Sequence, residues 1–114
     1  MLAKNRRIGK KIFSVHFSKL ERFVSPHLFL TIVKNEKANE PSRFAFSISK
    51  KICKRAVDRN RLRRQGYSIV GKYLKNIPDG FLFFFSFKKS AYPVSFADLE
   101  KEICGLLSVK IEQN

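Results

Sequence analysis

The sequence predicts an α+β fold, a two-layer α/β sandwich with elements in the order helix, strand, strand, helix, strand, helix (α-β-β-α-β-α). Three observations lead to this prediction. The 114 residues suffice for one hydrophobic core but not for two. Hydrophobic residues make up 44% of the chain and twelve residues are Phe, so the core can be substantial. Strand-length apolar runs are interspersed with stretches of helical period. We therefore expect a single domain over residues 1–114.

The first half of the chain is predicted to hold one helix and two strands. A short amphipathic helix is expected from Gly9 to about Leu20, because Phe13 and Phe17 share one helical face. After Ser25-Pro26, HLFLTIVK has the branched and aromatic composition of a strand. The polar run NEKANEPS is interpreted as a hairpin-like loop. The alternation of RFAFSIS then predicts a second strand, with a core face made of Phe44, Phe46 and Ile48.

The second half is predicted to hold two helices around one strand. A long helix is expected from about residue 54 to 76, with an apolar stripe formed by Leu62, Gly66, Ile69 and Tyr73. Gly66 disfavours the helix by about 1 kcal/mol relative to Ala, which close packing on the sheet would offset. FLFFFSF is apolar on both faces, as in an inner strand covered on two sides. Ser95 and Asp98 indicate an N-cap box that opens a last helix, with a buried face made of Phe96, Leu99, Ile103 and Leu106 or Leu107.

The net charge points to a polyanionic partner. The chain has 24 Lys and Arg residues against 9 Asp and Glu residues, a net charge of +15. A compact cation of this size repels itself, and a phosphate backbone relieves that repulsion. A membrane partner is disfavoured because no apolar run reaches the roughly 18 residues of a span. The basic N-terminus lacks an apolar core and cleavage site of a secretory signal, so we expect a cytoplasmic protein.

The chain offers no active site made of protein alone. Its acidic residues are scattered, and His16 and His27 are isolated, so surface or packing roles are expected for both. Cys53 and Cys104 lie far apart without metal-ligand spacing, which predicts two free thiols, with Cys104 in the core, and no zinc or other metal held by a protein motif. No phosphate-binding Gly-rich loop or nucleophile motif is present.

The stretch SKKICKRAVDRNRLRR is the strongest functional signal. It holds eight basic residues and one acidic residue, Asp58. Such a run is often only a solvated helix face, but five of the eight are Arg, whose planar fork grips phosphates bidentately. Helical spacing places Arg61 and Arg64 opposite the apolar stripe, with Arg59 and Arg63 on its flank. An Arg-dense face without an acidic counter-stripe suits recognition of an RNA backbone.

A second basic cluster precedes the Phe13 and Phe17 pair. The two rings are most simply core residues, but aromatic rings beside basic side chains can also stack on unpaired bases. Both interpretations stay open for these two residues. The basic members of the cluster are Lys4, Arg6, Arg7, Lys10 and Lys11.

The string SKKI followed by AVDRNRLRR resembles the Arg-Asn-Arg signature of the bacterial ribonuclease P protein family. In that family a strand ending in Ser-Lys-Lys leads through a short connection into a helix that bears Arg-Asn-Arg. The likeness extends over nearly the whole chain, from Arg7-Ile8 with Phe13 and Phe17 to the last amphipathic helix. It implies a sandwich like the second domain of ribosomal protein S5, with a left-handed strand-helix-strand crossover, which the general preference for right-handed crossovers would not predict.

The resemblance also implies a function. The family protein is the accessory subunit of an endoribonuclease whose RNA cuts precursor tRNA to give the mature 5′ end, using Mg2+ held through the RNA. The expected partners are therefore ribonuclease P RNA and precursor tRNA. The leader cleft would involve Phe13 and Phe17 with the basic residues Arg7, Lys10 and Lys11, together with residues on one face of the sheet. The RNA-binding residues would be Lys50, Lys51, Lys54, Arg55, Arg59, Asn60, Arg61, Arg63 and Arg64.

This chain departs from the family pattern at three places. Cys53 stands where Gly is common, and the spacing to Arg59 is one residue longer, so the connection is expected to be built differently. Gln65-Gly66-Tyr67 replaces a further basic residue, and Leu20-Glu21 replaces a Gly after the first helix.

Two other functions fit the charge and size. A ribosomal or other structural RNA-binding protein explains both, but not the specific string. A DNA-binding module lacks a recognisable groove-reading arrangement, so DNA is not an expected partner.

Overall fold

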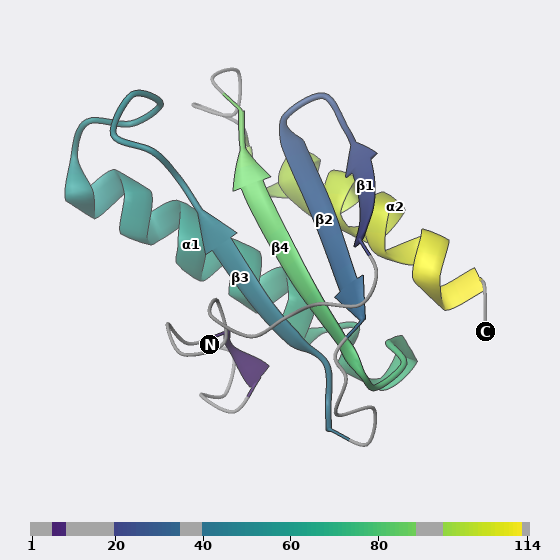
Figure 1. The fold of residues 1–114 in the computed structure, drawn as a ribbon. Helices are drawn as coiled ribbons and strands as arrows, with labels where there is room; N and C mark the ends of the chain where they lie inside the picture. Colours follow the sequence, from purple (N-terminus) through teal and green to yellow (C-terminus); the bar gives the residue numbers. More distant parts are fainter. Residues whose placement is uncertain (1–5, 9–19, 35–39, 89–94, 113–114) are drawn as a thin grey trace.

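The computed structural model describes residues 6–8, 20–34, 40–88 and 95–112. In this part of the chain, four strands form one sheet and two α-helices pack against it (Figure 1). The elements are β1 (Leu20–Val24), β2 (Leu28–Lys34), β3 (Arg43–Ser47), α1 (Ala56–Gly71), the single-turn 3-10 helix η3 (Leu74–Asn76), β4 (Phe81–Phe87) and α2 (Phe96–Glu112).

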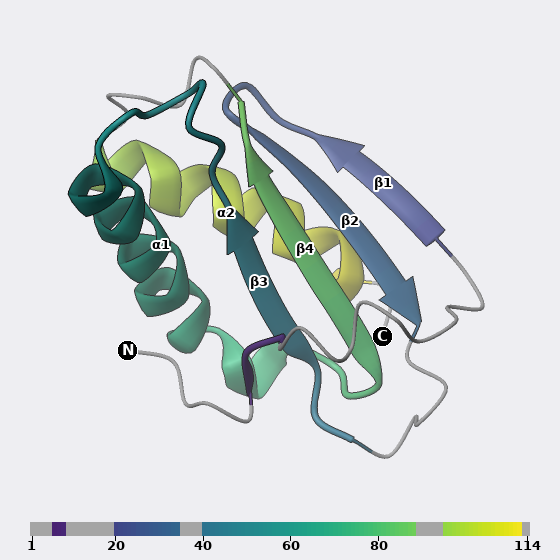
Figure 2. The same cartoon turned by 60° about the vertical axis from the view of Figure 1, so that its left-hand side comes forward.

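The strand order across the sheet is β1-β2-β4-β3, as Figure 2 shows. β2 pairs antiparallel with β1 and β4, whereas β3 pairs parallel with β4. The inner position predicted for FLFFFSF is confirmed, because this strand is β4. The prediction of a hairpin-like loop between HLFLTIVK and RFAFSIS is wrong, since β4 separates β2 from β3. The hairpin of this sheet is instead formed by β1 and β2.

β1 was not predicted from the sequence. Leu20, the expected end of the first helix, begins this strand, and the rest of that predicted helix lies outside the described residues. Exposure alternates along β1, with Arg22 and Val24 exposed and Phe23 packed against the core. Only five residues carry this alternation, and the helical spacing of the apolar residues before them conceals it.

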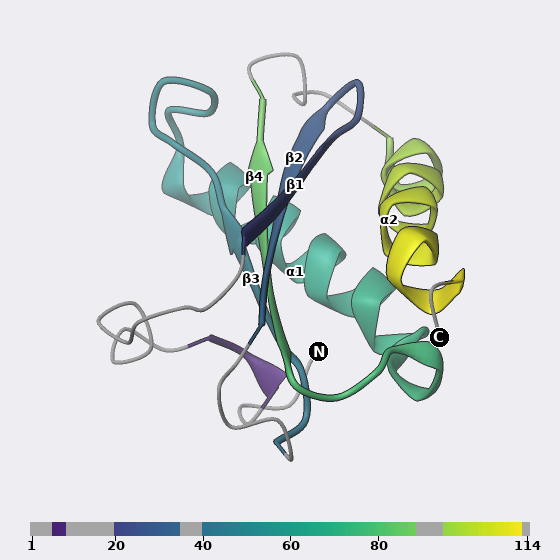
Figure 3. The ribbon, with the colours of Figure 1, turned by 45° about the vertical axis from the view of Figure 1, so that its right-hand side comes forward.

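Both helices cover the same face of the sheet. In Figure 1 both helices lie behind the sheet, and Figure 3, which views the sheet nearly edge-on, shows α2 and the later part of α1 on the same side. The strand side chains on that side are fully or almost fully buried, and Phe46 stacks on Phe85 with ring centroids 4.6 Å apart. This covered face is formed by Leu28, Leu30, Ile32, Phe44, Phe46, Phe83, Phe85 and Phe87.

The other face of the sheet, here called the open face, carries no described helix. Its buried side chains are Val33 and Leu82, at 2% and 1% exposure, while Phe84 and Ser86 are partly exposed. FLFFFSF is predicted to be covered on two sides, whereas the described helices cover only one face of this strand. β4 is apolar on both faces partly because it lies between two other strands, and not only because the helices cover one of its faces.

α1 is shorter than the helix predicted over residues 54–76. It spans Ala56–Gly71 and is followed by η3, so Tyr73 lies beyond its end. The rest of the predicted stripe is confirmed, because Leu62, Gly66 and Ile69 are buried. The predicted packing of Gly66 on the sheet is also confirmed by its contact with the Phe46 ring.

α2 begins with the predicted cap. The backbone N–H of Asp98 donates to Ser95 Oγ at 3.2 Å, which satisfies one of the free donors of the first turn. Leu99 and Ile103 are fully buried on the sheet side, as expected, whereas Phe96 is 37% exposed at the edge of that face.

The prediction for the cysteines is wrong in its choice of core residue. Cys53 is the buried thiol and Cys104 is partly exposed.

Candidate nucleic-acid interface

The basic stretch begins where β3 leaves the sheet. Lys50 and Lys51 lie in the turn after β3, and Lys54 and Arg55 lie in the segment that enters α1. All four side chains are exposed, whereas Cys53 between them is 5% exposed and anchors the connection in the core. The buried Cys53 thus holds the connection against the core while the cations on either side of it are exposed.

Asp58, the single acid of the stretch, orders its arginines. Its carboxylate accepts from Arg61 Nη2 at 3.3 Å and lies 3.7 Å from Arg55 Nε. The Asp58 side chain is only 12% exposed, whereas those of Arg55 and Arg61 are 76% and 56% exposed. Asp58 also lies in the first turn of α1, where the helix dipole stabilises a negative charge. The acid therefore fixes two guanidinium groups without covering them.

Arg59, Asn60 and Arg63 are also fixed by local hydrogen bonds. Arg59 Nη1 donates to the carbonyl oxygens of Cys53 and Lys54 at 2.9 and 2.8 Å, so this side chain braces the connection. Arg63 Nη1 donates to Asn60 Oδ1 at 2.6 Å. A preordered guanidinium loses less conformational entropy on binding a phosphate than a free one.

Arg64 is exposed, and no hydrogen bond or ion pair links it to another described residue. The helix dipole adds a partial positive charge at the start of α1, and no capping bond from the side chain of the N-cap residue, Arg55, covers it. The backbone N–H groups of the first turn and the side chains around them together favour an anion at this helix end.

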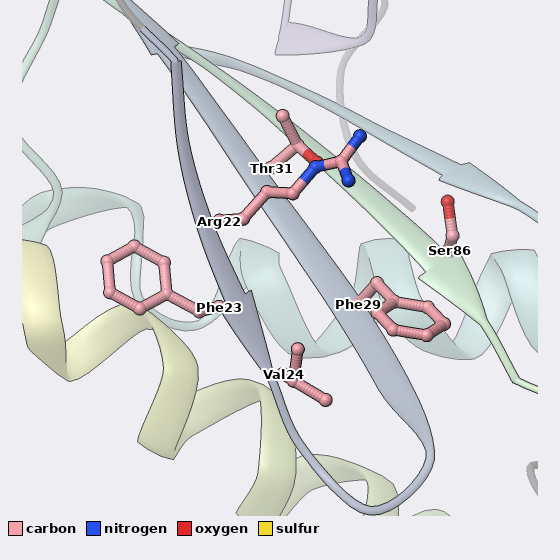
Figure 4. Close-up of a pocket in the computed structure, with 6 residues that line it drawn as sticks. All are labelled: Arg22, Phe23, Val24, Phe29, Thr31 and Ser86. Atoms are coloured by element: carbon pink, nitrogen blue, oxygen red, sulfur yellow. The ribbon is translucent and has the colours of Figure 1, made fainter.

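A groove of about 260 Å³ lies along the open face near β1 and β2. Figure 4 shows that the Arg22 side chain extends from β1 across β2, with Phe29 and Thr31 of β2 and Ser86 of β4 beside it. Phe29 is 46% exposed, an unusual state for a large aromatic side chain. The lining residues are Arg22, Phe23, Val24, Phe29, Thr31 and Ser86.

The register explains why these residues meet. Val24 pairs with Phe29 and Phe29 pairs with Ser86, so the three form one row across β1, β2 and β4. Ser86 in turn pairs with Ser47 of β3, and their hydroxyl oxygens lie 3.2 Å apart. The ammonium of Lys88 lies 4.7 Å from the centre of the Phe29 ring. The row thus joins an aromatic ring, two hydroxyl groups and a cation.

The groove and the basic stretch share one end of the sheet. β3 and β4 run parallel and end at Ser47 and Phe87, and the β1–β2 turn lies at the same end because Leu28 pairs with Phe87. The basic connection leaves β3 directly after Ser47 and Ile48. A single nucleic acid complex can therefore contact the groove and the start of α1 together.

The residues predicted for the leader cleft are only partly described. Arg7 forms an isolated parallel bridge with Phe44 of β3, and its carbonyl oxygen lies 3.5 Å from Arg43 Nη1. The Nε atoms of Arg7 and Arg43 are buried and have no hydrogen-bond partner among the described residues. The other predicted cleft residues, Lys10, Lys11, Phe13 and Phe17, lie outside the described residues.

The resemblance implies that one sheet face contributes to the leader cleft, but sequence reasoning does not identify which sheet residues form this surface. Arg22, Phe29 and Lys88 come from three different segments, and neither charge clustering nor helical spacing connects them. The signal that could have found Phe29 is its position in HLFLTIVK, where a strand pattern alternates it with the buried Leu28 and Leu30. Among the described residues, no three His, Cys, Asp or Glu side chains are grouped so as to hold a metal ion.

Comparisons with known proteins agree with the resemblance seen in the sequence. The model of the Ribonuclease P family matches residues 2–110. The ribonuclease P protein component of Microcystis aeruginosa is 34% identical over 89 alignment positions, which cover 76% of this chain and 74% of that protein. That of a Cyanothece species is 32% identical over 123 alignment positions, gaps included, which cover 95% of this chain and 94% of the relative.

Solved structures have the same fold. The ribonuclease P protein of Staphylococcus aureus superposes with a TM-score of 0.78 at 19% identity, covering 93% of this chain and 95% of that chain. The protein from Thermotoga maritima gives a TM-score of 0.69 at 22% identity, with 94% of each chain covered. The family match and the two sequence relatives together show that this chain belongs to the ribonuclease P protein family.

Proposed function

We propose that this protein, as a subunit of ribonuclease P, binds both the catalytic RNA and the 5′ leader of precursor tRNA and so assists removal of the leader. Cleavage of the phosphodiester bond is assigned to the RNA subunit, as the family resemblance implies. The observation that carries the proposal is that a preordered arginine cluster and an aromatic groove lie at the same end of the sheet. One surface suits a structured RNA and the other suits an unpaired strand.

The start of α1 is the proposed surface for ribonuclease P RNA. Most of its guanidinium groups are held by Asp58, Asn60 or backbone carbonyl oxygens, and all remain at least partly exposed, as contact with phosphates requires. Lys50 and Lys51 lie at the edge of this surface. The proposed RNA-binding residues are Lys50, Lys51, Lys54, Arg55, Arg59, Asn60, Arg61, Arg63 and Arg64.

The groove on the open face is the proposed site for the leader. Single-stranded RNA is held by rings that stack on bases and by cations that follow the backbone. Phe29 supplies an exposed ring, and Arg22 supplies a guanidinium that has no partner among the described residues. Arg7, Lys10, Lys11, Phe13 and Phe17 are proposed to complete the cleft from the N-terminal segment.

Other features of the proposal rest on the resemblance. Mg2+ is assigned to the RNA subunit, and the cytoplasm is the proposed location. The described helices include none long and apolar enough to cross a membrane.

We also infer a single domain and a left-handed β3-α1-β4 crossover. The placement of α1 behind the sheet, with β4 to the right of the parallel β3, supports that hand (Figure 1).

The experiment that tests the function is cleavage of precursor tRNA by the cognate ribonuclease P RNA at low Mg2+ concentration, with and without this protein. We expect the protein to restore cleavage at the mature 5′ end, because its cations replace part of the screening that Mg2+ otherwise supplies. Folded protein that leaves the rate unchanged would contradict the proposal and would favour a structural RNA-binding role instead.

A further inference from the structure

Glu102 contacts the turn between β1 and β2, which lies at the end of the groove on the open face. It lies on α2, on the covered side of the sheet, and its side chain is only 12% exposed. Ser25 Oγ donates to Glu102 Oε1 at 2.5 Å, and the backbone N–H of His27 donates to the same oxygen at 2.8 Å. His27 Nδ1 contacts the second carboxylate oxygen, Oε2. Both oxygens of one carboxylate are thus engaged by a single turn.

The carboxylate is held in its charged form. Burial raises the pKa of Glu102, but the hydrogen bonds from Ser25 and His27 lower it by more, so the net pKa lies below its ordinary value. Hydrogen bonds to a charged acceptor are shorter and stronger than those between neutral groups. The contact therefore constrains the turn more firmly than a neutral pair would.

The turn between β1 and β2 is not one of the loop types that match the twist of the paired strands. Pro26 and His27 form the two-residue loop between Ser25 and Leu28, and the Ser25 N–H donates to the Leu28 carbonyl at 2.9 Å. Two-residue hairpin loops that match the twist of their strands need residues with positive φ. No described residue other than Gly80 has positive φ, so this loop is of another kind. The contact with Glu102 is a constraint from outside the hairpin on how β1 lies against β2 at this loop.

The wall of the groove depends on how β1 lies against β2 at the turn. Val24 and Phe29 are the register pair next to the turn, and both line the groove. β1 is an edge strand whose neighbour in the described sheet is β2 alone. The Lys88 N–H donates to the His27 carbonyl at 2.9 Å, which ties the turn to the end of β4 and to the cation beside Phe29.

We propose that Glu102 is a positioning residue for leader recognition: it holds the Ser25–Leu28 turn so that Val24 and Phe29 form the wall of the groove. The inference rests on the proposed function of the groove as the leader site. Glu102 does not touch the RNA in this account, because α2 lies on the covered side of the sheet. It acts through the hairpin that it fixes.

The test compares Glu102→Ala with two other variants in reconstituted ribonuclease P, under conditions that block cleavage. The readout is the affinity for leader-bearing precursor tRNA divided by the affinity for mature tRNA. We expect Glu102→Ala to lower this ratio by about 3- to 10-fold, within the range seen for residues that act through others. Glu102→Gln should largely restore it, because an amide oxygen can still accept from Ser25 and His27.

The matched control is Glu100→Ala, on the same helix. Glu100 Oε1 accepts from Lys72 Nζ at 2.7 Å, so this variant removes one carboxylate from α2 without releasing the turn. Its ratio should equal that of the wild type. Faster hydrogen exchange of the His27 amide in Glu102→Ala, and not in Glu100→Ala, would report release of the turn independently of RNA binding.

The outcomes separate this inference from the function on which it rests. A folded Glu102→Ala protein with a wild-type ratio would overturn the inference, provided that Phe29→Ala lowers the ratio. If Phe29→Ala also leaves the ratio unchanged, the groove is not the leader site and both proposals fall. Should Glu102→Ala not fold, Ser25→Ala removes one of the three contacts, and the same inference then predicts a smaller fall in the ratio.

Discussion

The ring of Phe46 lies directly against the Cα of Gly66. A Cβ atom built on residue 66 would lie 2.6 Å from Cε1 of that ring, a distance that real side chains do not adopt. Phe46 cannot easily move away, because it stacks on Phe85 and meets the edge of Tyr67 with ring centroids 5.1 Å apart. Gly66 therefore sets how closely α1 approaches the sheet.

Gly66→Ala should destabilise the protein by about 1–2 kcal/mol. Overpacking a core typically costs about 1–3 kcal/mol, and the better helix propensity of Ala returns up to about 1 kcal/mol. Gly105→Ala on α2 is the control, since no atom lies within 4 Å of the added methyl group, and it should stabilise by about 0.5–1 kcal/mol. Urea denaturation of both variants measures these changes. Equal effects at the two positions would refute the packing argument.

Acidification should weaken the folded state through Glu102. Its pKa is lower in the folded protein than in the unfolded chain, so its contribution is complete above the unfolded pKa and is lost as the pH falls through the folded pKa. The free energy of unfolding of the wild type should therefore approach that of Glu102→Gln between about pH 5 and about pH 3. A constant difference over this interval would show that the carboxylate does not lose its contacts on protonation.

The two thiols should react at different rates in the folded protein. Cys53 is 5% exposed, whereas Cys104 lies at the partly exposed surface of α2. Cys104 also makes a side-chain hydrogen bond with Tyr73, which together with burial raises the pKa of Tyr73. We expect a thiol reagent to label Cys104 first and Cys53 only after opening of the core. Mass spectrometry of partly labelled protein identifies the site, and prior labelling of Cys53 would contradict the structure.

Leader binding should depend on the aromatic face of the sheet. Phe29→Ala removes a ring that is 46% exposed, so we expect little loss of stability and a loss of about 1–3 kcal/mol in binding of leader-bearing precursor tRNA. Mature tRNA should bind the holoenzyme almost unchanged. Phe85→Ala is not a suitable comparison for Phe29→Ala, because it would open a cavity in the core. Val24→Ala is a better comparison, because Val24 is 64% exposed and its truncation removes apolar area, but no aromatic ring, from the same groove.

The sequence predicts the local features of this fold well. The Leu62, Gly66 and Ile69 stripe, the Ser95 cap and the inner position of FLFFFSF each depend on residues within a few positions of one another. Helical period, capping chemistry and strand-length hydrophobicity are sufficient to recognise such features.

The features that the sequence does not predict depend on contacts between distant segments. The β2–β4 pairing joins residues about fifty positions apart. The packing of the whole sheet determines that β2 pairs with β4 and does not form a hairpin with β3. Glu102 meets Ser25 across 77 positions. The groove has the same origin, because Arg22, Phe29 and Ser86 share it only after the sheet has formed.

The salt dependence of binding to ribonuclease P RNA tests the central claim most directly. Arg61→Ala with Arg64→Ala removes two exposed cations from α1, and Lys75→Ala with Lys101→Ala removes two exposed cations elsewhere. Each lost phosphate contact lowers the slope of log affinity against log salt by about 0.7–0.9. We predict that the slope falls by about 1.4–1.8 in the arginine variant and hardly changes in the lysine variant. Equal slopes in the two variants would show that the RNA responds to net charge alone and that the start of α1 is not its binding surface.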